Sequence, residues 1–309
     1  MDRDTFLTTV YVMTDDYVQA TQRAWPATTG PDRQLSVSEV LTLALLSRWR
    51  IFDSERDFYG YVRRHWRRAF PGLPARSQFN RWVRASLDGL CGLSQHLAGL
   101  AEPLAAAYEA LDTMSCATRH VKRRGNGWLA GEANIGASNR LGWYEGLNVI
   151  TSVTPRGVIT GFGCAPASTK EQPYAETFLA ARAYPQPGLP EVGRRCTGVY
   201  LADNGFCGTA RHAQWASAYG AVVITPPQRQ LAKYPWPKAV RRAFASLRQI
   251  VETVHQKLLH VFRLEHERPH DLHGFRARLA ASCALHNLCI CLNQALGRQA
   301  LEFADLVEW

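Results

Sequence analysis

Three acidic residues stand at positions where their carboxylates could act together. Asp112 follows the apolar pair Ala110–Leu111, and Asp203 follows the apolar run Val199–Ala202, so both aspartates are expected at strand ends. Glu252 lies inside a long amphipathic stretch that is typical of a helix. In an open α/β sheet, the strand ends face the crevice where ligands bind. We therefore expect the three acids to meet in such a crevice.

Carboxylates that converge in one crevice repel each other unless a cation neutralises them. Mg²⁺ prefers oxygen ligands and usually takes a few carboxylates together with substrate phosphates. The three acids are therefore candidates for the ligands of a divalent metal in a site of phosphodiester chemistry.

Each acid also has a simpler interpretation. Asp203-Asn204-Gly205 is a common turn sequence. Arg248 precedes Glu252 by four residues, so the two could form a helix-surface ion pair worth about 0.2–0.5 kcal/mol. Other candidates for the third acid lie in the loop that follows: Glu265, Glu267 and Asp271.

The elements that must position these acids are strands with helices between them. Strand-like runs cover residues 110–113, 146–154, 157–164, 198–202 and 221–225, and helix-like stretches cover 174–183 and 209–219. This alternation is typical of a mixed α/β core. Two long periodic stretches, residues 238–262 and 272–296, are predicted to be helices that pack on the sheet.

The first third of the chain is predicted to be mostly helical. Ser36 with Glu39 forms a capping-box pattern in front of an apolar periodic run that extends to Trp49. Further helices are expected near residues 55–68, 77–87 and 91–109. Short helices with short breaks are typical of a compact bundle. We therefore divide the chain into a helical domain, residues 1–105, and an α/β domain, residues 106–309.

The charge of the chain suggests a polyanionic partner. There are 36 basic and 26 acidic residues, which gives a net charge of +10. Residues 48–84 carry ten arginines and three acids, a net charge of +7. Four of these arginines fall on one stripe of a predicted helix: Arg63, Arg64, Arg67 and Arg68. The stripe could bind DNA phosphates, which would give affinity without sequence choice, or it could be a solvated surface that needs no ligand.

Composition excludes several classes of protein. The apolar share of 46% and the charged share of 20% are those of a folded globular chain. No stretch of 18 apolar residues predicts a membrane span, and the first residues do not have the pattern of a secretory signal, so we expect a cytoplasmic protein. The phosphate-cradling pattern G-x-x-x-x-G-K is absent, so no nucleotide cofactor is expected.

The order of Asp112, Asp203 and Glu252 on strand, strand and helix resembles the DDE transposases of bacterial insertion sequences. Asp112-Thr113 is similar to the family's first-Asp motif, and Asp203-Asn204-Gly205-Phe206 is similar to its second. Arg248-x-x-x-Glu252 looks like the Arg and Glu of the family's C-terminal helix signature. The acids are 91 and then 49 residues apart, which leaves no room for a large domain before the last helix. The resemblance covers residues 36–296.

This resemblance implies an RNase H-like core, a mixed sheet flanked by helices, preceded by a helical DNA-binding domain. It implies that Asp112, Asp203 and Glu252 are catalytic and hold two Mg²⁺ ions about 3.5–4 Å apart, with Mn²⁺ as a substitute. One ion would activate a water or a DNA 3′-hydroxyl, and the other would stabilise the leaving oxygen.

The implied reaction is cleavage at the ends of a mobile element, followed by joining of the 3′-hydroxyl ends to target DNA. Two element ends must be held together, so we expect a homodimer on double-stranded DNA, in the nucleoid of a bacterial cell. The rival interpretations are a structure-selective nuclease on the same core and a catalytically inactive DNA-binding protein derived from a transposase.

Basic residues near the acids are candidates for phosphate contacts. Arg248 and Lys257 are expected near the scissile phosphate. A Gly-rich stretch after the first Asp is predicted to be a phosphate-binding loop, with a plain solvated loop as the alternative: Lys122, Arg123 and Arg124. The family signature often has a basic residue seven positions after the Glu, where this chain has Leu259, so Lys257 or His260 could replace it.

Overall fold

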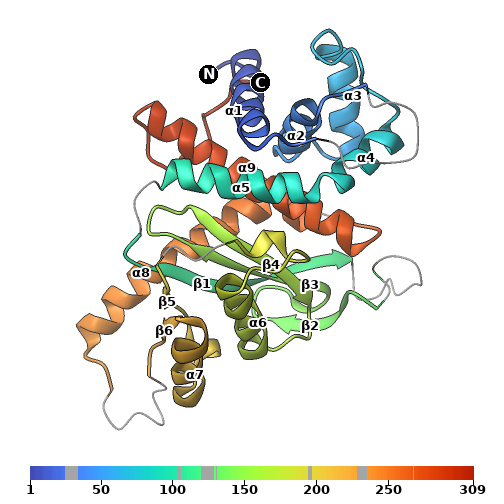
Figure 1. Ribbon diagram of the computed structural model, residues 1–309. Helices are drawn as coiled ribbons and strands as arrows, with labels where there is room; N and C mark the ends of the chain where they lie inside the picture. Colours follow the sequence, from blue (N-terminus) through green and yellow to red (C-terminus); the bar gives the residue numbers. More distant parts are fainter. Residues whose placement is uncertain are drawn as a thin grey trace.

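The computed structural model describes residues 1–24, 34–102, 106–119, 129, 131–193, 197–227, 235–266 and 268–309. Within these residues, a mixed six-stranded sheet lies between two helical layers, and further N-terminal helices stand outside one of the layers (Figure 1). This arrangement confirms the predicted α/β class, with an RNase H-like mixed sheet and a helical N-terminal region.

The sheet combines an antiparallel meander with two parallel strands. Its strands are β1 (Glu109–Arg119), β2 (Asn134–Ser138), β3 (Gly142–Val153), β4 (Ile159–Pro166), β5 (Val199–Leu201) and β6 (Val222–Ile224). β3 pairs antiparallel with β1 and with β4, while β5 pairs parallel with β1 and with β6. β2, which the sequence did not predict, pairs with the first residues of β3.

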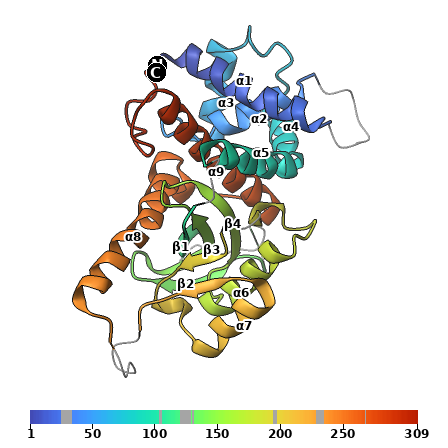
Figure 2. The ribbon, with the colours of Figure 1, turned by 60° about the vertical axis from the view of Figure 1, so that its left-hand side comes forward.

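Helices cover both faces of this sheet (Figure 1, Figure 2). Below it in Figure 1 lie α6 (Glu171–Ala183) and α7 (Thr209–Tyr219); on the other face lie α5 (Leu87–Ala101), α8 (Lys238–Gln256) and α9 (Leu272–Ala295). α9 is buried on nearly every side between α5 and the sheet. No described helix combines the length and the apolar character that a membrane crossing requires.

The N-terminal helices are α1 (Arg3–Thr21), α2 (Val37–Leu46), α3 (Glu55–His65) and α4 (Arg76–Ala85). The predicted capping box is present at α2, since Ser36 Oγ accepts from the Glu39 amide at 3.1 Å and a Glu39 carboxylate oxygen accepts from the Ser36 amide at 2.6 Å. One hydrophobic cluster runs from Phe6 through α9 to Phe162 on β4. The helical region therefore shares its core with one face of the sheet.

Besides the helix predicted over residues 91–109, which ends at Ala101, two predictions of local structure are wrong. Asp112 does not end a short strand; it lies inside β1, where its cross-strand neighbour is Thr151 on β3. Polar residues within β1 hide the strand in the sequence, because their side chains serve the site rather than the core. The second error concerns the arginine stripe: α3 ends at His65, so Arg67 and Arg68 lie beyond it. The chain turns there towards Pro71, which disfavours helix in the residue before it.

Candidate active site

Asp112 and Asp203 are brought together by the pairing of two parallel strands. Ala110 on β1 stands opposite Leu201 on β5, and each aspartate follows two residues later on its own chain segment. Asp203 caps the turn after β5, where its Oδ1 accepts from the Gly205 amide at 2.8 Å. Burial is the largest cause of the raised pKa of Asp112, and the nearby charge of Asp203 adds to it. The structure therefore brings the two aspartates near each other, but Asp203 does not line the hollow that Asp112 and Glu252 share.

Glu171, the first residue of α6, places a third carboxylate, which the sequence did not predict, close to the two aspartates. Thr113 Oγ1 donates to Glu171 Oε1 at 3.1 Å. A side chain at position 205 would collide with the Glu171 carboxylate and would approach Asp203 Oδ1, so both acids lie against Gly205. The sequence did contain a signal for this acid, because an acidic residue followed by Pro173 is typical of the first turn of a helix. The helix was predicted to begin only at Tyr174, where the apolar pattern begins.

α8 brings Arg248 and Glu252 to the other side of Asp112. Arg248 Nη2 lies 3.0 Å from Asp112 Oδ2, and the two side chains are 13% and 14% exposed. Arg248 thus pairs with Asp112 and not with Glu252. The exposed Glu252 lines, together with Asp112, a hollow of about 460 Å³. Within the described ranges, no three His, Cys, Asp or Glu side chains lie close enough to hold a metal ion together.

A buried histidine anchors this part of α8. His255 Nε2 lies 2.7 Å from Thr151 Oγ1, and Thr151 is the cross-strand neighbour of Asp112. Burial lowers the pKa of His255 to about 3, with a smaller contribution from the charge of Arg248. The imidazole is therefore neutral at pH 7. Its hydrogen bond fixes α8 against β3 and so sets where Arg248 and Glu252 lie.

The acids carry an electrostatic cost that a cation would relieve. Burial raises the pKa of Asp112 to about 7; Arg248 opposes this rise, while Asp203 and Glu171 add to it. Burial, and next Asp203, also raise the pKa of Glu171. The donors are carboxylate and hydroxyl oxygens, which are the ligands that Mg²⁺ and Mn²⁺ accept. The chemical type of these donor groups and their negative charge therefore fit a divalent metal ion.

The rival third acids have other partners. Glu265 forms an ion pair with Arg140 at 2.6 Å, and His260 Nδ1 lies 3.2 Å from the same carboxylate. Asp271 caps the start of α9 and pairs with Arg84 at 2.6 Å. The last rival, Glu267, falls outside the described residues.

The candidates for phosphate contacts near the acids differ in their surroundings. The Lys257 ammonium lies over the ring of Phe303, 5.6 Å from its centroid, and Lys257 does not line the hollow beside Asp112. Leu259 is buried and does line it, while His260 is exposed. The predicted loop residues Lys122, Arg123 and Arg124 lie outside the part of the chain that the structure describes.

All four arginines of the predicted stripe, Arg63, Arg64, Arg67 and Arg68, are exposed. The Arg67 guanidinium also donates to the carbonyls of Phe70 at 3.4 Å and Leu73 at 3.1 Å, so it supports the turn after α3.

Comparison with known proteins gives one finding. A family model described as a transposase DDE domain matches residues 118–288, more than half of the chain. The matched segment contains Glu171, Asp203 and Glu252, and it begins six residues after Asp112. No curated protein and no solved structure gives a significant match.

Proposed function

The chain belongs to the DDE transposase family, and from this premise we propose that it cuts phosphodiester bonds at the ends of its own mobile element and joins the 3′-hydroxyl ends to target DNA. The observation that carries the proposal is the meeting of Asp112 and Asp203 at the end of β5, with Glu252 facing the same hollow as Asp112. A basic protein that gathers acids in one place suits a metal that acts on a polyanion.

In this proposal Asp112, Asp203 and Glu252 hold the divalent metal, and Glu171 is a fourth candidate ligand. When bound, the metal ions supply a water of lowered pKa and stabilise charge on the phosphoryl and leaving oxygens. Arg248 offsets the charge of Asp112 in the metal-free protein and orients its carboxylate. Thr113 orients Glu171 through its hydroxyl. Since burial raises the pKa of Asp112 to about 7, cation binding near neutral pH would release its proton.

The proposal also includes a double-stranded DNA partner and a homodimer that holds two element ends. Exposed Arg63, Arg64 and Arg68 are proposed to contact DNA phosphates. The predicted loop of Lys122, Arg123 and Arg124, together with Lys257 and Arg248, is proposed to contact DNA near the scissile bond.

A cleavage and joining assay tests this function. Purified protein is mixed with a labelled duplex that carries the DNA flanking its own gene, in Mg²⁺, Mn²⁺ or EDTA, together with a supercoiled target plasmid. We expect a metal-dependent nick at an inverted-repeat boundary, followed by transfer of the label to the plasmid, and neither product with Glu252→Ala.

The products separate the rival functions. Cutting of branched DNA without end preference and without joining would show a nuclease. Binding of the flanking DNA with no cutting in either metal would show an inactive DNA-binding protein.

A further inference from the structure

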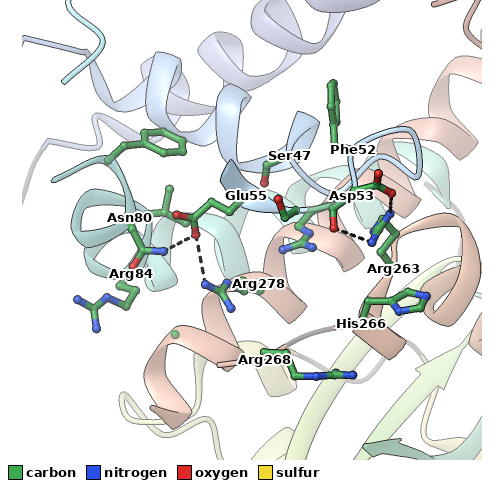
Figure 3. Close-up of a pocket in the computed structure, with 15 residues that line it drawn as sticks. Ser47, Phe52, Asp53, Glu55, Asn80, Arg84, Arg263, His266, Arg268 and Arg278 are labelled. Carbon is green, nitrogen blue, oxygen red and sulfur yellow. Dashed lines mark hydrogen bonds and ion pairs between the residues drawn. The ribbon is translucent and has the colours of Figure 1, made fainter. Parts of the chain in front are cut away.

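An arginine-rich cleft lies between the N-terminal helices and the segment that leads into α9. Two adjoining hollows, of about 360 and 520 Å³, share lining residues from both sides, among them Glu55, Arg84 and Arg278 (Figure 3). The N-terminal side contributes five arginines: Arg48, Arg56, Arg76, Arg81 and Arg84. The C-terminal side contributes Arg263, Arg268 and Arg278. We call these two hollows the arginine cleft.

The lining of the arginine cleft has a large excess of positive charge. Among the described residues that line it, eight are arginines and three are acids, Asp53, Glu55 and Asp271, so the arginines exceed the acids by five. Each acid is already paired with arginine: Asp53 with Arg263 at 3.2 Å, Glu55 with Arg76 and Arg278, and Asp271 with Arg84. Like charges held in a concave surface repel each other and attract a polyanion.

Ion pairs across the arginine cleft hold its two walls in place. Arg84 on α4 pairs with Asp271 at the start of α9 at 2.6 Å, and Glu55 on α3 accepts from Arg278 on α9 at 3.2 Å. Figure 3 shows Glu55 between Asn80 and Arg278, with Arg268 on the opposite wall. Preorganised walls reduce the ordering cost of binding a ligand.

The arginine cleft adjoins the acidic hollow described above. Arg140 lines that hollow together with Asp112 and Glu252. Arg140 also pairs with Glu265 at 2.6 Å, and two residues close to Glu265 in the chain, Arg263 and His266, line the cleft. The helical turn Leu264–His266 therefore connects the wall of the cleft to Arg140 of the hollow.

We propose that the arginine cleft binds the phosphodiester backbone of duplex DNA and leads it towards the acidic hollow. The choice of DNA as the occupant rests on the proposed function, while the anionic character of the ligand rests on the cleft alone. Guanidinium groups bind phosphate oxygens in a bidentate manner. This surface combines N-terminal and C-terminal residues, and it does not include Arg63, Arg64 or Arg68.

Fluorescence anisotropy with a labelled duplex tests the proposal, with EDTA present so that no cutting occurs. The cleft variant is Arg81→Glu/Arg268→Glu, which changes one exposed arginine on each wall. A charge-matched control, Arg3→Glu/Arg156→Glu, changes arginines that do not line the cleft. Each protein is titrated with the flanking duplex and with a random duplex of equal length, from 50 to 300 mM NaCl.

We expect the cleft variant to bind both duplexes about a hundredfold more weakly, roughly tenfold for each lost arginine–phosphate contact. The slope of log affinity against log salt concentration should fall by about two, because each phosphate contact contributes about 0.9. The control should stay within about threefold of the unchanged protein. Equal losses in the cleft and control variants would overturn the proposal, because they would reflect net charge alone.

Circular dichroism and thermal melting check that the variants fold. If the glutamate variant is unfolded, Arg56→Ala/Arg81→Ala replaces it, with the same loss of salt slope expected. The proposed function and the cleft proposal can fail independently. If the unchanged protein binds DNA through the cleft but does not cut it in the presence of metal ions, the transposase activity is refuted and the cleft proposal stands. A cleft variant that binds normally while the unchanged protein cuts refutes the cleft alone.

Discussion

Replacement of Arg182 by Met should destabilise the protein strongly, because it breaks a buried ion pair beneath the candidate site. Glu109 Oε1 accepts from Arg182 Nη2 at 2.9 Å and from Ser152 Oγ at 3.0 Å, and Thr160 Oγ1 also donates to it. The side chains of Glu109 and Arg182 are 0% and 1% exposed. The network joins β1, three residues before Asp112, to the helix that begins at Glu171.

The expected loss follows from this burial. Removal of one partner of a buried pair leaves an uncompensated charge and costs about 3–5 kcal/mol. Arg3→Met is the matched control, because the side chains of Arg3 and Asp4 are 40% and 70% exposed and lie 3.7 Å apart, and surface pairs contribute under about 1 kcal/mol. The double variant Glu109→Gln/Arg182→Met should recover part of the loss, since the unpaired charge is then gone.

Urea unfolding followed by circular dichroism gives the free energy of unfolding of each variant. A loss below about 1 kcal/mol for Arg182→Met, equal to that of Arg3→Met, would refute the reasoning. A double variant no more stable than Arg182→Met would show that the loss comes from packing and not from an unpaired charge.

Four further outcomes follow from the site. Metal affinity should strengthen by about tenfold or more from pH 6 to pH 8, because Asp112, with its pKa raised to about 7, must lose a proton before it binds a cation; equal Mn²⁺ affinities by calorimetry would contradict this. Without metal, the pKa of Asp112 is higher in the folded protein than in the unfolded chain, so protonation of Asp112 stabilises the fold. This stabilisation is complete below about pH 4 and is lost as the pH rises to about 7. Gly205→Ala should reduce metal-dependent cleavage about tenfold or more, since its Cβ would displace the Glu171 carboxylate; unchanged cleavage rates would place Glu171 outside the site. Thr151→Val should lower the unfolding free energy by about 1–3 kcal/mol by removing the partner of the buried His255 nitrogen, and a loss under 0.5 kcal/mol in chemical unfolding would show that the contact contributes little.

Local sequence patterns predicted most of the helices and strands, because each pattern depends on interactions between residues that are close in sequence. The predicted helix at Thr209–Tyr219 has the observed bounds of α7, and Ser36 with Glu39 caps α2 as the pattern indicates. β1 was predicted too short for a physical reason. The prediction ended at Thr113, because Ser115 and Thr118 interrupt the apolar pattern of the residues after Thr113, whereas β1 continues to Arg119.

Partners distant in sequence could not be predicted in this way. The guanidinium of Arg248 reaches Asp112, 136 residues away, and not the acid one turn along its own helix. Glu171 joins the aspartates only because α6 begins beside Gly205 in space. The high arginine content of residues 48–84 is visible in the sequence, but the arginines that α9 and the preceding segment add to the cleft are not.

The most direct test of the central claim, that the acids of β1, the β5 turn and α8 form one metal-dependent catalytic site, is the rate of cutting at an element end by isosteric variants. Asp112→Asn, Asp203→Asn and Glu252→Gln are compared with the unchanged protein in Mn²⁺, at protein concentrations that saturate the DNA. The account predicts that each variant binds the duplex within about threefold of the unchanged protein and cuts it more than about a hundredfold more slowly. Cutting at the normal rate by Glu252→Gln would contradict the account, because the helix would then not supply the third acid.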